Sequence, residues 1–211
     1  MILAYLLNST VTAYNALSVL RQQTMPGDMI QGHITNGGLA PNIIHAYAAG
    51  LFVVRANTKS RLEELKKKVQ KCFEAGAEAT GATLKLTPVM GYDDMMPNKV
   101  LGRLCRNAFN QLGGDILPPE LDFLQGGTKA SSDQGNVSYA MPSIMLGFGI
   151  ECEEGNHNPK FAEAARSMQA HGAAIRAAKA IAVTGLDVLA DQKLLVEAKK
   201  EFKEMLDTQK V

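Results

Sequence analysis

Tryptophan is absent from this 211-residue chain, aromatic residues make up only 6% of it, and cysteine occurs three times. The cysteines, Cys72, Cys105 and Cys152, are odd in number and far apart, and no CxxC pair occurs. This argues against a structural zinc site built from cysteines. It favours reduced thiols in a cytoplasmic compartment.

An excess of charge of either sign is also lacking, since Lys and Arg total 22 and Asp and Glu total 21. We therefore expect neither nucleic acid nor a membrane as a partner. No apolar run is long enough to span a bilayer. The first 20 residues, MILAYLLNSTVTAYNALSVL, are interrupted by polar side chains and have no basic segment before them. We interpret them as a helix with a buried face; a weak signal peptide is the alternative.

The hydrophobic fraction of 46% supports a globular core in one large domain or two small ones. Over residues 11–89 the patterns predict a helix at 11–23, strands at 29–35 and 43–56, a helix from the N-cap Thr58 to Gly81, and a strand at 82–89. This order is typical of an α+β domain, with an antiparallel sheet and helices on one face.

Residues 90–97 are interpreted as a hinge before a second, less regular region. There we expect a helix capped by Asn98 and ending near Leu112, a loop at 126–132, a short strand at 143–150, an Ala-rich helix at 161–190 opened by Pro159, and a last helix at 192–208. This region is interpreted as part of an α/β layer.

His157 is the most conspicuous of the four histidines. It lies on a Gly/Asn turn before an expected helix, and Glu151, Glu153 and Glu154 precede it. It could be a metal ligand or part of an acidic surface loop. The other histidines, for which we expect partly buried, hydrogen-bonded side chains, are His33, His45 and His171.

Asn42 and Arg55 form a second candidate pair, because a guanidinium and an amide can together bind a carboxylate. An unbroken strand would hold them about 40 Å apart at ~3.3 Å per residue, whereas a turn near residues 48–50 would make them cross-strand neighbours. The alternative is an edge asparagine and a surface arginine. The Gly- and Ser-rich stretch at 126–133 lacks the order of a phosphate loop, and Ser132 has no triad partners placed by sequence.

Two groups of motifs resemble the aminoacylase and glutamate-carboxypeptidase zinc hydrolases. GGLAPNII followed by FVVRA is similar to their lid, or dimerisation, domain, and SSDQGNVSYAMPSI followed by NHNPKFAEAA is similar to the carboxy-terminal part of their catalytic domain. The resemblance covers residues 11–206 and points to the amidohydrolase branch that includes aminoacylase-like dipeptidases.

The resemblance implies a catalytic α/β domain interrupted by a lid of a four-stranded sheet and two helices. It also implies amide hydrolysis of acyl-amino acids or dipeptides with one or two zinc ions and a glutamate base. His157 matches the last metal ligand. Asn42 and Arg55 match residues that bind the substrate carboxylate, often across a homodimer formed through the lid. His45 replaces a usual proline and is expected to have no catalytic role.

By this resemblance, residues 1–90 are a lid domain without its first strand, and residues 91–211 are the carboxy-terminal portion of the catalytic domain. The chain is expected to be truncated at its amino terminus. The remaining metal ligands, the catalytic glutamate and a lid histidine would precede it, and the pair Glu153-Glu154 does not replace them. We therefore expect an inactive chain when isolated. The alternatives are a non-enzymatic association module and a small-ligand-binding α+β domain.

Overall fold

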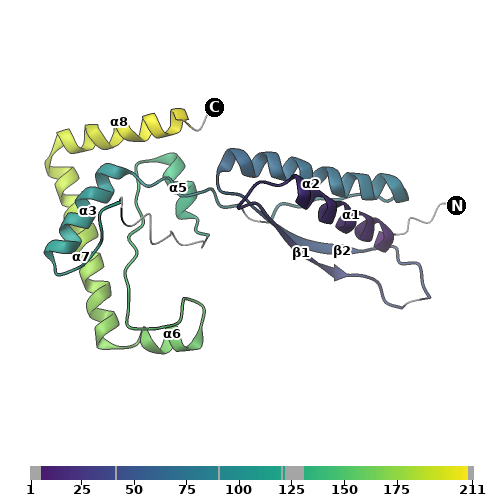
Figure 1. The fold of residues 1–211 in the computed structure, drawn as a ribbon, viewed down its shortest axis with the longest axis horizontal. Helices are drawn as coiled ribbons and strands as arrows, with labels where there is room; N and C mark the ends of the chain where they lie inside the picture. Colours follow the sequence, from purple (N-terminus) through teal and green to yellow (C-terminus); the bar gives the residue numbers. More distant parts are fainter. Residues whose placement is uncertain (1–5, 41, 90, 120, 122–130, 209–211) are drawn as a thin grey trace. The chain divides into compact units, whose positions relative to one another are not determined.

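The computed structural model describes residues 6–40, 42–89, 91–119, 121 and 131–208. The chain forms two compact units, Met1–Asp94 and Met95–Val211. The division expected after residue 90 lies in the same stretch between the helices labelled α2 and α3 in Figure 1.

The first unit contains a β-hairpin. Strands β1 (Met29–Asn36) and β2 (Ala49–Arg55) pair antiparallel, with Met29 opposite Arg55 and Ile34 opposite Gly50. Gly32 lies opposite Phe52, and a Cβ atom at position 32 would collide with the Phe52 ring. The absence of a side chain at Gly32 therefore lets Phe52 lie across the inner face of the hairpin.

Helices α1 (Leu6–Leu20) and α2 (Lys59–Thr80) pack against each other and lie alongside this hairpin (Figure 1). A single turn of 3₁₀ helix, Arg21–Gln23, follows α1. Phe52 contacts Phe73 of α2 edge-on, with ring centroids 4.8 Å apart. The expected antiparallel α+β class is confirmed for this unit. Its buried core consists of Leu17, Ile30, Leu65 and Val69.

Both ends of α2 lie where the sequence predicted them, because each is fixed by a local capping residue. The Thr58 hydroxyl accepts a hydrogen bond from the Arg61 N–H at 3.3 Å, which caps the first turn. Gly81 ends the helix in the left-handed region at φ 67°, and its N–H points back to carbonyls of the last turn.

The strand expected at 82–89 is wrong. These residues are irregular and pair with no strand that the structure describes. Leu84, Leu86 and Val89 are 36%, 47% and 78% exposed. Alternating apolar residues are compatible with a pleated backbone, but a strand also needs a neighbouring edge for its hydrogen bonds.

The second unit consists of helices and irregular segments in its described residues. Helix α3 (Lys99–Gln111) packs against α7 (Met168–Ala190), and α8 (Gln192–Thr208) contacts both. Two shorter helices are α5 (Gln134–Ala140) and α6 (Pro159–Ala164). The core of α3 and α7 consists of Cys105, Ala108, Phe109, Ala177 and Ala180.

Asn98 joins the start of α3 to α8. Its side chain is fully buried, accepts the Leu101 N–H at 3.1 Å and donates to the Ala198 carbonyl at 3.0 Å. The Glu201 carboxylate of α8 accepts the N–H groups of residues 99 and 100 at 2.9 and 3.2 Å. Three otherwise unsatisfied donors at the helix N-terminus are thus paired, which confirms Asn98 as a cap.

Two expectations for this unit are corrected. The strand at 143–150 is wrong, although Ile144 and Leu146 do pack on the α3–α7 core while Met145 between them is 52% exposed. The alternation is that of a half-buried strand, but no partner strand exists among the described residues. The Ala-rich helix is broken at 165–167, because the Ser167 hydroxyl caps α7 by accepting the Ala170 N–H at 3.1 Å.

Helix α5 was not expected, and the predicted loop at 126–132 falls mainly on residues outside the described ranges.

The three cysteines form no disulfide. Burial raises the pKa of the Cys72 and Cys105 thiols, which disfavours the reactive thiolate. Within the described ranges, no helix combines the length and apolar character needed to cross a membrane.

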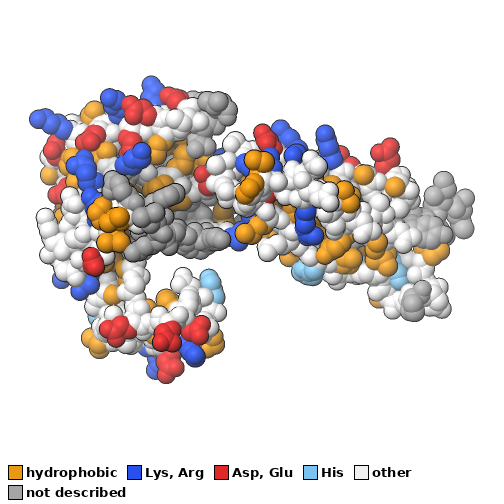
Figure 2. Space-filling model, in the orientation of Figure 1, with side chains coloured by type: hydrophobic (Ala, Val, Ile, Leu, Met, Phe, Trp, Pro, Cys, Tyr) orange, Lys and Arg blue, Asp and Glu red, His pale blue; other side chains and the backbone are white. Residues whose placement is uncertain are grey.

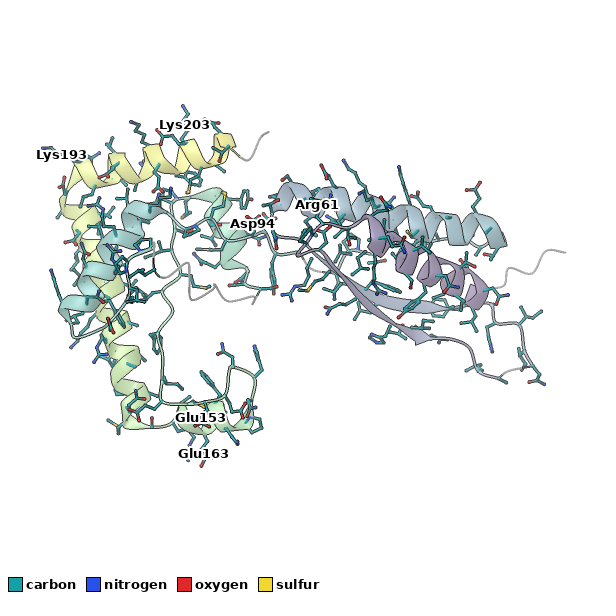
Figure 3. The ribbon with its side chains drawn as sticks, in the orientation of Figure 1. Arg61, Asp94, Glu153, Glu163, Lys193 and Lys203 are labelled. Atoms are coloured by element: carbon teal, nitrogen blue, oxygen red, sulfur yellow. The ribbon has the colours of Figure 1, made fainter. Side chains whose placement is uncertain are left out.

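A buried ion pair between Asp28 and Arg61 joins the turn before β1 to helix α2. Figure 3 labels Arg61 near the start of α2. The Asp28 side chain is 1% exposed, and its carboxylate accepts hydrogen bonds from Arg61 Nη2 at 2.6 Å and Nε at 3.2 Å. The Met25 N–H also donates to it at 2.9 Å. The hydrogen bonds from Arg61 hold the pKa of Asp28 below its ordinary value of 3.8.

Replacing Asp28 with Asn should lower the stability of the first unit at neutral pH and reduce its sensitivity to acid. Because the folded-state pKa is depressed, the carboxylate contributes its full stabilisation above the unfolded-state pKa, near 3.8, and loses it as the pH falls through the folded-state pKa. Urea midpoints of Asp28→Asn and the parent should therefore converge below this pH.

Glu63→Gln is the matched control, because Glu63 is 52% exposed in its pair with Lys66 and should matter little. Parallel pH profiles for Asp28→Asn and the parent would contradict the assignment.

Candidate functional site

Asn42 lies in the connection between β1 and β2, at the end of the hairpin near the start of α1. Its side chain is exposed and lines a cavity of about 580 Å³. Leu7 and Asn8 of α1 line the same cavity. No sequence pattern indicated this contribution from α1, because the two segments are far apart along the chain.

His45 organises this connection. Its ring accepts the Leu39 N–H, with 3.1 Å between the Leu39 nitrogen and Nε2, and Nε2 also lies 3.1 Å from the Ala40 carbonyl oxygen. A Cβ atom at Gly38 would collide with this ring, and Gly38 has a φ of 114°. The second glycine of the GG pair is thus required by a close approach and by its backbone conformation. The expected half-buried, hydrogen-bonded state is confirmed for His45.

Arg55 lies at the other end of the hairpin. It is the last residue of β2, partly buried, and pairs across the sheet with Met29. The other six residues of β2 separate it from the connection that carries Asn42, a length of about 20 Å at ~3.3 Å per residue. The pairing therefore does not make Asn42 and Arg55 cross-strand neighbours within one chain.

His157 lies in the second unit on an exposed turn. Its φ of 66° makes it the one non-glycine residue of the described ranges in the left-handed region, which is uncommon for such residues. Asn158 fixes the following chain, since its Oδ1 accepts the Lys160 N–H at 2.9 Å and its Nδ2 donates to Glu154 Oε2 at 3.2 Å. Pro159 opens α6 as expected. The turn holds the imidazole at the surface.

The donors near His157 do not make a complete metal site. No group of three or more His, Cys, Asp or Glu side chains in the described ranges could hold a metal ion. Glu154 is engaged by Asn158 and lies 3.6 Å from Lys160 Nζ. Figure 3 labels Glu153 and Glu163 near α6, but they complete no such group. The described residues therefore do not form a zinc site by themselves.

The two remaining histidines differ from the expectation of partial burial. His33 is exposed on the outer face of β1 opposite Leu51, and His171 is exposed on α7. Strand and helix periodicity predicted their elements, but which face of each element meets a partner depends on tertiary packing.

No family model matches the chain. It is 39% identical to the Xaa-Arg dipeptidase of Mus musculus over 198 residues, which is 93% of this chain and 46% of that protein. Identity to the Xaa-Arg dipeptidase of Homo sapiens is 37%, covering 93% of this chain and 45% of the relative.

A third relative is a component of the p-aminobenzoyl-glutamate hydrolase of Escherichia coli (strain K12). It is 22% identical over 274 aligned residues, covering 99% of this chain and 56% of that protein. The chain belongs to the family of these dipeptidases and amidohydrolases. It spans about half the length of the curated relatives that it matches. The amidohydrolase and dipeptidase family suggested by the motifs is thus confirmed.

Replacing Gly38 with Ala should destabilise the first unit by more than about 1 kcal/mol, because the new Cβ meets the His45 ring in a strained backbone conformation. Urea unfolding measures the change, and NMR signals of residues 42–45 should shift.

Gly37→Ala is the matched control, because a Cβ there makes only ordinary contacts at 3.6 and 3.8 Å. Equal effects of the two substitutions would refute the role of the His45 contact.

Proposed function

We propose that this chain is part of an amide hydrolase of the dipeptidase type, to which it contributes Asn42 and Arg55 as substrate-binding residues and His157 as a metal ligand. The observation that carries the proposal is the 39% identity to an Xaa-Arg dipeptidase over 93% of the chain. The left-handed backbone of His157 supports it, because strained residues cluster at functional sites.

The substrate class follows from what the relatives' names share. An Xaa-Arg dipeptide and p-aminobenzoyl-glutamate each contain an amide bond to an amino acid with a free carboxylate. Arg55 offers the planar fork that binds a carboxylate. We therefore propose dipeptides or acyl-amino acids as substrates, with a basic carboxy-terminal residue as the first choice.

We further propose that the 211-residue chain does not hydrolyse these substrates by itself. A catalytic zinc ion takes about three protein ligands, polarises the amide carbonyl and activates water. His157 supplies one ligand, and the described residues around it supply no further set. The remaining ligands and the general base would have to come from other polypeptide segments.

Incubation of the purified chain with zinc and either an Xaa-Arg dipeptide or an acyl-amino acid should give no turnover above a blank. Amine release by ninhydrin or mass spectrometry is the measurement. A full-length Xaa-Arg dipeptidase serves as the positive control. Turnover that a chelator removes and that His157→Ala abolishes would overturn the inactivity and leave the hydrolase assignment standing.

Association through the first unit is the second candidate function, because its outer sheet face exposes several apolar side chains among polar ones. Met29, Leu51 and Val53 are 38%, 47% and 48% exposed, and hydrophobic side chains are visible on the surface of this unit in Figure 2. Each strand of the described sheet has one neighbour, so each has an outer edge that could pair with another chain. A homodimer would cover this face and such an edge.

Light scattering coupled to size exclusion should accordingly give twice the 22.7 kDa mass of one chain. Val53→Lys should shift the mass towards the monomer, because it replaces an exposed apolar side chain of this face with a charge. Val196→Lys is the matched control, since Val196 is 57% exposed on α8 in the other unit. A monomeric parent chain would count against this function.

A further inference from the structure

Helix α7 has apolar side chains on two opposite sides. One side packs on α3 and carries the small buried residues Ala177 and Ala180. At 3.6 residues per turn, Ile175, Leu186 and Leu189 lie within about 60° of one another on the opposite side of the helix axis. Their side chains are 43%, 64% and 85% exposed. We call these three residues the second apolar face of α7.

A helix at a protein surface normally has a polar outer side, and a helix that is apolar all round is normally covered on all sides. Lys179 is the only Lys, Arg, Asp or Glu of α7 on the same side as the second apolar face. Its long stem can lie over apolar surface while its ammonium group stays in water. Helix α8 contacts α7 but leaves this face exposed. The second apolar face therefore has the character of a surface that another polypeptide covers.

Residues 145–150 of the same unit run as a nearly straight stretch between α5 and α6, with no strand drawn beside them (Figure 1). In the part of the chain that the structure describes, no backbone–backbone hydrogen bond involves their N–H or C=O groups. A Cβ atom at Gly147 or Gly149 would meet no described atom within 4 Å, so another backbone can approach closely. The segment thus offers the unpaired backbone groups that a β-strand of another chain can bind.

The partner that suits both features is a polypeptide that offers a strand and an apolar surface. More than half of the mouse Xaa-Arg dipeptidase lies outside the part that matches this chain. In that relative, the matching part is therefore accompanied by a further polypeptide long enough for a domain of its own. A second copy of this chain would bring another unpaired segment but none of that polypeptide.

We propose that the second unit binds a polypeptide of the kind that forms the other half of these dipeptidases, through strand pairing at residues 145–150 and through the second apolar face of α7. The inference rests on the proposed amide-hydrolase function, because it names the partner from which that function takes its remaining metal ligands and general base. The apolar face supplies surface that leaves water, and the unpaired backbone supplies the hydrogen bonds that orient the partner.

Co-expression tests the proposal directly. The full chain is produced together with an affinity-tagged polypeptide that comprises the residues of the Mus musculus Xaa-Arg dipeptidase outside its match to this chain. A one-to-one complex should purify on the tag, with a chelator present so that neither zinc nor turnover enters. Alternate backbone amides within residues 145–150 should then exchange hydrogen at least about tenfold more slowly than in the chain alone, because strand pairing protects them. The matching part of the mouse enzyme, co-expressed in the same way, is the positive control.

Exposed positions allow variants that leave the fold of the chain intact. Leu186→Lys combined with Leu189→Lys, and separately Met145→Lys, should each reduce the recovered complex at least about fivefold, because each puts a charge into the contact. Val19→Lys is the matched control and should leave the recovery unchanged, since Val19 is 70% exposed on α1 in the other unit. Urea midpoints of the uncomplexed variants should equal that of the parent.

Failure of the chain to purify with a tagged polypeptide that does purify with the positive control would overturn the proposal, and so would unchanged exchange of residues 145–150 in the complex. A dimer of the chain alone that the Leu186→Lys, Leu189→Lys double variant dissociates would assign this surface to a second copy and overturn it as well. Each of these failures would leave the hydrolase assignment intact, because that assignment is tested by turnover and not by this association.

Discussion

The register of the β1–β2 hairpin is the constraint from which the placement of the candidate residues follows. Met29 pairs with Arg55, so the connection between the strands, with Asn42, lies at the opposite end. The same register places Phe52 across Gly32 on the inner face, where it meets Phe73 of α2. A shift by one residue would turn Phe52 outward and remove it from the core. The packing of Phe52 and the separation of Asn42 from Arg55 are therefore consequences of the same strand pairing.

Polar side chains, of which those of Asp28 and Asn98 are buried, hold the ends of elements around each core. In the first unit, Asp28 accepts hydrogen bonds from Arg61 and from the backbone of its own turn. In the second, Asn98 and Glu201 satisfy the N-terminal N–H groups of α3. Burying a polar group costs free energy unless the group is hydrogen-bonded. Each of these arrangements therefore favours one position of the helix that it contacts.

The candidate functional residues are also divided between the two units. The first unit offers an amide and a guanidinium at opposite ends of a hairpin. The second offers one imidazole, on a turn whose backbone at His157 is left-handed. The proposed amide-hydrolase function would give these residues a common purpose.

Features that depend on neighbouring residues could be predicted from the amino-acid sequence. Thr58, Gly81, Asn98 and Pro159 mark helix ends because capping is a matter of a few consecutive backbone groups. The helical spacing of apolar residues placed the main helices for the same reason. The family motifs around Asn42, Arg55 and His157 were also recognisable without a structure.

In contrast, the alternating segments at 82–89 and 143–150 are not strands, because no described neighbour offers hydrogen bonds. The contact of His45 with Gly38, the cavity that α1 helps to line, and the separation of Asn42 from Arg55 likewise join or divide residues through packing. Local patterns specify an element, but the face and edge that it shares with others are specified only when the chain has folded.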